Sequence, residues 1–252
     1  MPSLALAEIA GFLDDYLAVP GFPDYPNALN GVQVENSGPI RRVAAAVDAS
    51  QAVIDAAKDW ADLLIVHHGL FWAGLQPLTG PRFGRVKALV ETNTALYSAH
   101  LPLDAHAEVG NSAVLARKLG VASLEPFGDF QGTAVGWKGV VDAPLEALAR
   151  SLEEATGTRP QILPGGPGHV RTAAVVTGAG ASTLSEAAAA GLDLLVTGEA
   201  QHHHAIEAAE LGVSVALGGH YATETWGVKA LASLLEQRFG IEGRFVDSPT
   251  GL

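Results

Sequence analysis

Cysteine is absent from this chain of 252 residues. Disulfides, thiolate nucleophiles, iron–sulfur clusters and zinc fingers are therefore excluded, and any bound metal must be held by nitrogen and oxygen ligands. Basic residues are scarce, because 15 Lys and Arg stand against 27 Asp and Glu, a formal net charge of −12. An acidic surface repels phosphate backbones and anionic lipids, and there is no basic run, so we expect neither a nucleic-acid nor a membrane partner.

Long hydrophobic runs are also missing, although 48% of the residues are hydrophobic. No apolar run approaches the ~20 residues that span a bilayer. The first 20 residues lack the basic start of a signal peptide and carry early carboxylates. They predict an amphipathic helix, with Leu6, Ile9, Leu13 and Leu17 on one face. We therefore expect a globular, cytoplasmic protein with a sizeable core.

Short aliphatic runs alternate with alanine-rich helical stretches, which is typical of an α/β fold with largely parallel strands. Glycine and proline predict a loop over residues 71–84. The expected strands of the first half are 43–50, 62–66 and 94–100, and its expected helices are 51–61, 85–93 and 111–121, the last with Asn111 as N-cap.

The second half repeats the first. DLLIVHH at 62–68 matches DLLVTGE at 193–199, and the offset is 131 residues. His100 and Asp104 fall on His220 and Glu224 with an offset of 120. Because polar as well as apolar positions coincide, the sequence predicts two duplicated, pseudo-symmetric α/β units, residues 1–126 and 127–252. The stretch 126–144 between them is expected to be irregular.

Histidines and carboxylates follow the predicted strands at their carboxyl ends, where parallel α/β sheets bind ligands. They are His67, His68, His100, Asp104, Glu199, His220 and Glu224. Imidazoles and carboxylates without sulfur suit Zn, Mn, Fe, Co or Ni, and a bridging carboxylate suits a pair of such ions about 3.5–4 Å apart.

The spacing of these residues predicts local geometry. His67 and His68 point to opposite sides of an extended strand, so they serve one ion only if the chain turns, which Gly69 permits, and otherwise two ions. Pro102 favours a loop that curls His100 and Asp104 towards one place. His220 and Glu224 would share one face of a helix.

The other histidines weigh less, because a single histidine at a strand end is usually a polar residue that meets water. One member of the run His202, His203 and His204 could face the site while the others face solvent. His106 and His169 are expected to be surface or cap residues.

The motifs HHGLFW, SAHLPLDAHAEVGNSAVLARKLG, TGE and GGHYATE occur in this order, with NGVQVE at 30–35 before them. Together they resemble the Nif-three-like family of dinuclear-metal hexameric proteins, also named GTP cyclohydrolase 1 type 2 homologues. The resemblance covers nearly the whole chain. It implies a toroidal homohexamer and two divalent metal ions per chain, held by His67, His68, Asp104, His220 and Glu224. His100 and Glu199 are our own candidates for proton transfer.

Two bridged metal ions would supply a hydroxide nucleophile and stabilise a developing oxyanion, which is the equipment of a hydrolase. We therefore expect metal-dependent hydrolysis of a small molecule, and the resemblance suggests opening of the imidazole ring of GTP. No P-loop is present to hold a triphosphate. GAGAST at 178–183 could offer backbone N–H groups to an anion, but a plain strand-to-helix turn is the simpler explanation. The alternative is a non-catalytic metal-binding scaffold or protein-interaction protein.

Overall fold

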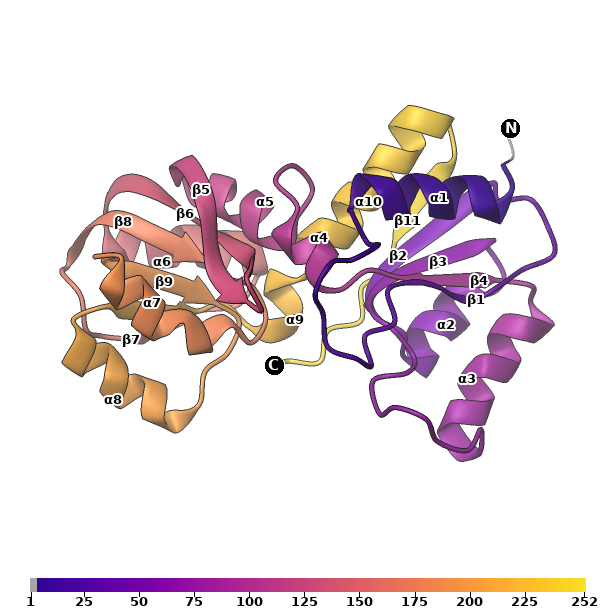
Figure 1. Cartoon of the computed structure of the whole chain (residues 1–252), viewed down its shortest axis with the longest axis horizontal. Coiled ribbons are helices and arrows are strands. Elements are labelled where there is room, and N and C mark those ends of the chain that lie inside the picture. The colour runs from indigo at the N-terminus through magenta and orange to yellow at the C-terminus, as the bar shows by residue number, and fades with distance from the viewer. Residues whose placement is uncertain (1–3) are drawn as a thin grey trace. The chain divides into compact units, whose positions relative to one another are not determined.

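The computed structural model describes residues 4–252, which divide into two compact units. Unit 1 comprises the chain through Leu103 together with Gly227–Ser248, and unit 2 comprises Asp104–Trp226 and Pro249–Leu252. Both units are mixed layers of helix and sheet (Figure 1). No helix within residues 4–252 is long and apolar enough to cross a membrane.

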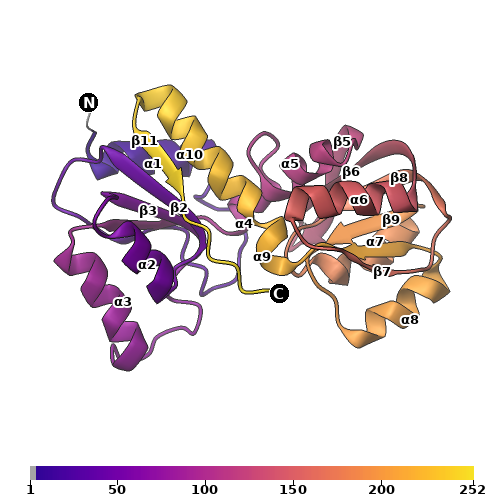
Figure 2. The same cartoon turned by 180° about the vertical axis from the view of Figure 1, so that it is seen from behind.

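Unit 1 is built on a five-stranded sheet with the order β1-β4-β3-β2-β11. β2, β3, β4 and β11 run parallel, and β1 joins β4 antiparallel. Figures 1 and 2 show α1 and α10 on one face of this sheet and α2 and α3 on the other. The bounds are β1 (Gly31–Val34), β2 (Arg42–Asp48), β3 (Leu63–His68), β4 (Ala95–Ser98), β11 (Glu242–Phe245), α1 (Leu6–Tyr16), α2 (Gln51–Ala57), α3 (Gly80–Glu91) and α10 (Thr225–Phe239), whose first residues belong to unit 2.

Helices on both faces explain the unbroken aliphatic run of β3. Leu64 and Val66 pack in one cluster with residues of α2 and α3, while the neighbouring Leu63 and Ile65 are equally buried. A strand covered on both sides needs apolar residues at every position. The first residues that can carry polar chemistry are therefore the last two of the strand, His67 and His68.

Unit 2 is built on a six-stranded sheet with the order β5-β6-β8-β9-β10-β7. α5 and α6 lie on one face and α7 and α8 on the other (Figures 1 and 2). The bounds are β5 (Ala122–Phe130), β6 (Thr133–Pro144), β7 (Gln161–Leu163), β8 (His169–Val175), β9 (Leu194–Thr197), β10 (Ser214–Leu217), α5 (Asn111–Lys118), α6 (Leu145–Thr156), the short 3₁₀ helix η1 (Gly180–Thr183), α7 (Leu184–Ala189), α8 (His202–Leu211) and α9 (His220–Thr223).

The two units share one topology, in agreement with the predicted duplication. The order β1-β4-β3-β2 in unit 1 corresponds to β7-β10-β9-β8 in unit 2, and in both an antiparallel edge strand precedes three parallel strands. Asp62 accepts the backbone N–H groups of Arg41 and Arg42, and Asp193 accepts those of Arg171 and Thr172, at 2.8 and 3.1 Å in each case. In each unit an aspartate therefore holds the N-terminal part of the equivalent strand, β2 in unit 1 and β8 in unit 2.

The two compact units have other bounds than the predicted units 1–126 and 127–252. That boundary falls inside β5, and unit 1 recruits its fifth strand, β11, from the C-terminal part of the chain. The duplicated strands of each unit come from one continuous part of the chain. The strand β11, which completes the sheet of unit 1, follows the second copy in the sequence.

The stretch 126–144 is not irregular. It lies within the antiparallel hairpin β5–β6, joined by Gln131 and Gly132, which both have positive φ (53° and 87°). Two consecutive residues with positive φ match the tight hairpin turn whose twist suits the flanking strands. Because β6 also pairs antiparallel with β8, the sheet of unit 2 adds this hairpin to the parallel strands β8, β9 and β10.

Three local predictions need correction. α3 begins at Gly80, earlier than the expected residue 85, and its first turn accommodates Pro81. Residues Leu101–Ala105 form the short helix α4 rather than a loop, because Pro102 lies in the first turn, where a missing N–H costs nothing. The N-cap of α5 is Gly110 and not Asn111, whose side chain instead binds Asp104.

Candidate metal centre

Three histidines gather at the carboxyl ends of β3 and β4 in unit 1. His67, His68 and His100 each offer a ring nitrogen within 4.8 Å of the others. His67 is fully buried and His100 is 8% exposed. The ring centroids of His67 and His68 are only 4.7 Å apart, although the two residues are adjacent on a strand. This cluster could hold a metal ion.

Each of these rings has an oxygen atom facing its Nδ1. Nδ1 of His67 lies 2.9 Å from the carbonyl oxygen of Ala99, and Nδ1 of His68 lies 2.9 Å from Oδ1 of Asp48. Nδ1 of His100 lies 2.8 Å from Oδ1 of Asp24. An oxygen acceptor at Nδ1 places the proton there and leaves the lone pair of the neutral ring on Nε2, which is the arrangement that metal-binding histidines adopt.

Asp24 and Asn30 together hold His100. Oδ1 of Asn30 accepts the backbone N–H of His100 at 2.7 Å, and Nδ2 of Asn30 donates to Oδ2 of Asp24 at 2.8 Å. Burial raises the pKa of Asp24, but hydrogen bonds from His100, Asn30 and the backbone of Tyr25 outweigh it, so the pKa lies below its ordinary value. Asp24 and Asp48 belong to no motif and were not predicted from the sequence, whereas Asn30 opens the NGVQVE stretch.

Gln33 of the same stretch holds the chain just after the histidine pair. Its Oε1 accepts the N–H of Leu70 at 2.8 Å, and a Cβ at Gly69 would overlap its side-chain amide. Gly69 is therefore needed to make room for Gln33. The predicted turn at Gly69 is not what brings the rings together, because β3 continues through His68.

In unit 2, His220 and Glu224 lie together as predicted. Nε2 of His220 is 3.2 Å from Oε2 of Glu224, and its Nδ1 is 3.2 Å from Oε1 of Glu199. The bond to Glu224 raises the pKa of His220 to about 9, Glu199 adds to this, and burial opposes it. Gly178 makes room for the pair: it has φ of +64°, and a Cβ there would overlap Oε1 of Glu224.

Asp104 is a buried carboxylate at the start of unit 2, with 5% of its surface exposed. Its Oδ1 accepts a hydrogen bond from Nδ2 of Asn111 at 2.9 Å and one from Oγ1 of Thr177 at 3.1 Å. Both donors are neutral, so they orient the carboxylate without cancelling its charge. A buried carboxylate oriented in this way is a possible ligand for a metal ion.

The remaining histidines differ from the cluster in unit 1. His203, His204 and Glu207 also bring possible ligand atoms together, but the N–H of Gln201 donates to Nδ1 of His204 at 3.0 Å. Its proton therefore sits on Nε2, and this ring is not prepared to bind a metal. As expected, His106 is a cap residue that accepts two backbone N–H groups, and His169 lies at the surface, paired with Asp142.

A sequence model of the Duf34/NIF3 (NGG1p interacting factor 3) family matches residues 4–250. The chain belongs to the Duf34/NIF3 family. It is 44% identical over 248 residues to a protein of Deinococcus radiodurans named "GTP cyclohydrolase 1 type 2 homolog", covering 97% of this chain and 94% of that one. A Halobacterium salinarum protein of the same name is 47% identical over 257 residues, with 98% and 99% covered.

Solved structures of this family have the same fold. The protein TTHA1606 of Thermus thermophilus matches with a TM-score of 0.91 and 43% identity, covering 99% of this chain and 100% of that one. Reduced HcgD from Methanocaldococcus jannaschii matches with a TM-score of 0.85 and 25% identity, with 98% and 99% covered. The Duf34/NIF3 fold is therefore shared from end to end.

Proposed function

We propose that this Duf34/NIF3 protein binds two divalent transition-metal ions, with His67, His68, Asp104, His220 and Glu224 as ligands. The observation that carries the proposal is the pair His67 and His68 in unit 1, each with an oxygen atom that fixes the proton on Nδ1. The donors are nitrogen and oxygen only, which suits Zn, Fe, Mn, Co or Ni.

Two of the proposed ligands lie next to the points where the chain passes from one unit to the other. The chain leaves unit 1 after Leu103 and returns to it at Gly227. Asp104 stands directly at the first crossing and Glu224 just before the second. His100 precedes Asp104 by four residues, a span of at most about 14 Å in an extended chain. This short span limits how far His100 can lie from Asp104.

The function we propose is metal-dependent hydrolysis of a small molecule. Bound metal ions would activate water and polarise the substrate. His100, held by Asp24, presents a basic Nε2 that can take up a proton, and Glu199 holds the Nδ1 proton of His220. Opening of the imidazole ring of GTP is the specific reaction that the names of the relatives suggest.

Elemental analysis tests the metal pair. Wild-type protein should hold two transition-metal ions per chain, and Asp104→Ala should lose metal. Asp142→Ala is the matched control, because it removes an exposed carboxylate of the same unit. If reconstituted wild-type protein does not retain metal, both the proposed metal centre and the proposed hydrolase activity are contradicted.

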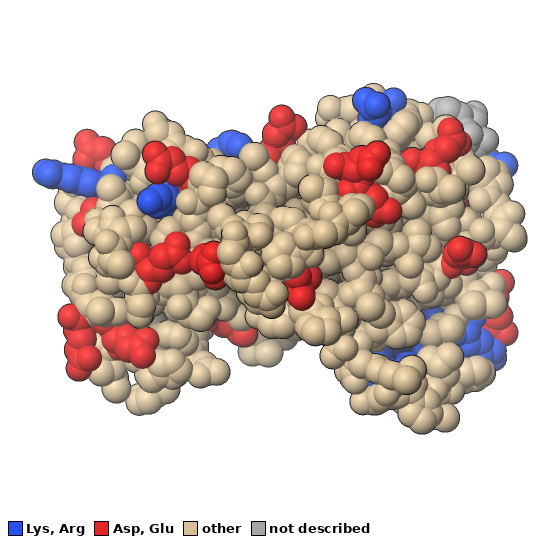
Figure 3. Space-filling view, in the orientation of Figure 1, with Lys and Arg blue, Asp and Glu red and all other residues tan. Residues whose placement is uncertain are grey.

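A substrate screen separates the enzyme from the alternative, a metal-binding scaffold without turnover. Metal-loaded protein is offered phosphoesters, amides and nucleotides including GTP. Hydrolysis that Asp104→Ala abolishes supports the enzyme, whereas full metal loading without turnover of any compound supports the scaffold. Nucleic acid is not an expected partner: on the face in Figure 3 basic side chains form no continuous stripe, and carboxylates are spread over the surface.

We further propose a cytoplasmic homohexamer. Exposed apolar side chains on α3 and the loop before it are suited to a subunit contact, namely Leu75, Leu78, Phe83 and Val90. Six chains of 26.0 kDa give about 156 kDa. Light scattering on the purified protein should return this mass, and a mass of one or two chains would contradict the hexamer.

A further inference from the structure

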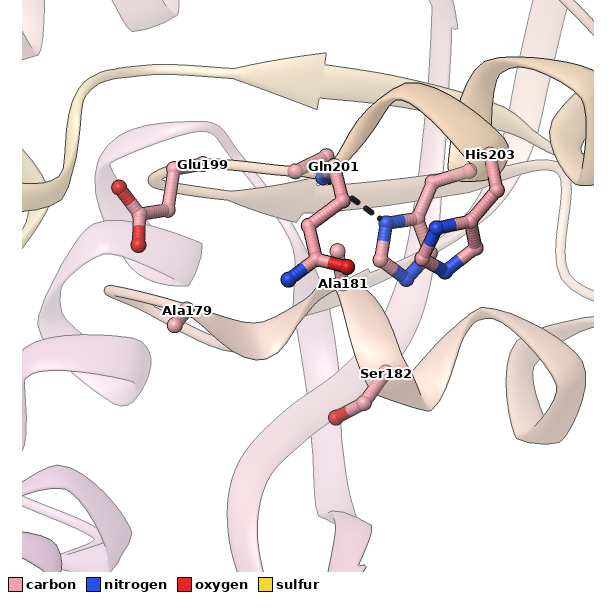
Figure 4. A pocket seen from close by; sticks show the side chains of 8 residues that line it. Ala179, Ala181, Ser182, Glu199, Gln201 and His203 are labelled. Atoms are coloured by element: carbon pink, nitrogen blue, oxygen red, sulfur yellow. Dashed lines mark hydrogen bonds between the residues drawn. The ribbon is translucent and has the colours of Figure 1, made fainter.

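A cavity of about 470 Å³ in unit 2 brings together two motifs that the metal centre does not use. The GAGAST turn contributes Ala179, Ala181 and Ser182, and the histidine run contributes His203 and His204. Figure 4 shows Gln201 between the two, with its amide group directed towards Ser182, and Glu199 at the opposite end from His203.

The wall of this cavity carries polar groups that are not used within the protein. Within residues 4–252, the Ser182 hydroxyl, the side-chain NH₂ of Gln201 and the His203 ring make no hydrogen bond, and neither does Nε2 of His204. All of them can donate a hydrogen bond. The part of the cavity away from Glu199 is therefore suited to a ligand with several oxygen acceptors.

His204 is the most informative of these groups. It is only 8% exposed, and its Nδ1 is occupied by the N–H of Gln201, so Nε2 must carry the proton. A buried ring N–H that lines a cavity without an acceptor costs free energy unless a ligand or water satisfies it. The ring of His203 packs against it with centroids 4.1 Å apart.

Two backbone N–H groups of the GAGAST turn are already used within the protein. The N–H of Gly178 donates to Oγ1 of Thr223 at 3.1 Å, and the N–H of Gly180 donates to Oγ1 of Thr197 at 2.9 Å. These two amides are therefore not available to an anion, and the side chains are the donors that the cavity is shown to offer.

The opposite end of the cavity adjoins a proposed metal ligand. Glu199 lines the cavity, and its Oε1 is 3.2 Å from Nδ1 of His220. A molecule anchored at Ser182, His203 and His204 would therefore extend towards Glu199 and His220.

We propose that this cavity binds an anionic oxygen group, a phosphate monoester or a carboxylate, of the molecule on which the metal centre acts. The anchor is the donor set of Ser182, Gln201, His203 and His204. The binding itself is independent of the proposed hydrolase function, and only the role of the bound molecule as substrate rests on it.

Paired substitutions at His204 test the donor. His204→Asn keeps an acceptor near the position of Nδ1 for the Gln201 N–H but loses the Nε2 donor, whereas His204→Gln places an amide N–H near Nε2. Calorimetric titration of metal-loaded protein with inorganic phosphate, and separately with acetate, measures affinity. His204→Asn and Ser182→Ala should bind about tenfold or more weakly, while His204→Gln retains most of the affinity. His202→Asn, a neighbouring exposed histidine outside the cavity, is the matched control.

The anion that wild-type protein binds with the higher affinity identifies the group that the cavity prefers. If neither phosphate nor acetate binds, the proposal is overturned. Equal affinity of wild type, His204→Asn and Ser182→Ala also overturns it. Asp104→Ala separates this site from the metals: retained phosphate binding supports the cavity, even if the protein turns over no substrate. Loss of phosphate binding together with the metal shows that the anion sits on the metal ions instead, and refutes the proposal.

Discussion

The position of the ring proton distinguishes the histidines of this protein more sharply than burial does. His67 and His204 are both buried beside a backbone group, but a carbonyl oxygen faces Nδ1 of His67, and an N–H faces Nδ1 of His204. The first ring keeps its lone pair on Nε2, and the second keeps a proton there. One neighbouring atom thus makes one histidine suited to bind a metal ion and the other suited to donate a hydrogen bond.

The partner of His68 should therefore control metal affinity. Asp48→Ala removes the acceptor at 2.9 Å from Nδ1 of His68 and frees the ring to rotate and change tautomer. Loss of such a partner typically weakens metal binding about 10–100-fold. Competition with a chromophoric chelator measures the change. Asp55→Ala, which removes a surface carboxylate paired with Lys58, should leave the affinity unchanged, and an equal effect of both would contradict the argument.

Gly178 should be essential for a steric reason in addition to its backbone conformation. Gly178→Ala places a methyl group in overlap with Oε1 of Glu224 and must displace that carboxylate. Gly191→Ala is a matched control, because Gly191 has nearly the same φ, +66° against +64°, but no atom within 4 Å of the added Cβ. Both variants should lose about 1 kcal/mol of stability from the left-handed backbone.

Metal content then separates the two glycine variants. Gly178→Ala should lose metal, as elemental analysis would show, and Gly191→Ala should retain it. Equal metal content would mean that Glu224 adapts to the methyl group or is not a ligand.

Asp24 should make stability depend on pH in the acid range. Its folded-state pKa is depressed below the ordinary 3.8, so below about pH 5 the unfolded chain binds more protons at this group than the folded protein does. The stabilisation is present above the ordinary pKa and is lost as the pH falls through the folded pKa. Asp24→Asn lacks this titration, so urea unfolding should show its stability deficit shrinking from about pH 5 towards about pH 3. A constant deficit would exclude the linkage.

At the scale of elements, the sequence predicted what periodicity and strand ends reveal. β3 and its two histidines and the His220–Glu224 pair were found because apolar runs and spacing determine them locally. The hairpin β5–β6 was missed because its turn, Gln131-Gly132, lacks the usual Asn-Gly or Asp-Gly signal and its strands are half exposed.

The orienting carboxylates could not be predicted for a different reason. Asp24 lies 76 residues before His100, and Asp48 lies 20 residues before His68. The pairing of β2 with β3 places Asp48 opposite His68, and the loop before β1 carries Asp24 to His100. Only the folded sheet makes these residues neighbours.

The loop that follows β3 provides an optical reporter. The indole of Trp72 meets the ring of His100 edge-on, with centroids 4.7 Å apart and planes at 80°, and it lies 5.9 Å from the ring of His68. Paramagnetic Co²⁺ bound at these histidines should quench Trp72 fluorescence in proportion to occupancy. Trp72→Phe should abolish most of the quenching, and Trp137→Phe, in β6 of unit 2, should not. Undiminished quenching in Trp72→Phe would place the metal elsewhere.

At the scale of the whole molecule, the two duplicated units differ in how their residues are distributed along the chain. Unit 2 is almost continuous in sequence, whereas unit 1 is completed by residues that follow it, Gly227–Ser248. The proposed ligands are divided too, with His67 and His68 in unit 1 and the other three in unit 2. Metal binding should consequently link the stability of one unit to that of the other.

Calorimetric unfolding tests this coupling. Metal-loaded protein should unfold in one transition, because free metal at about 1,000 times its Kd adds about 4 kcal/mol that is lost when either unit opens. Removal of metal by a chelator should lower the midpoint and separate the transitions of the two units. Asp104→Ala should resemble the chelated protein from the start and be insensitive to chelator. If elemental analysis confirms metal removal and the wild-type transition is unchanged, the metal ions do not bridge the two units, and the ligand set must be assigned to one unit alone.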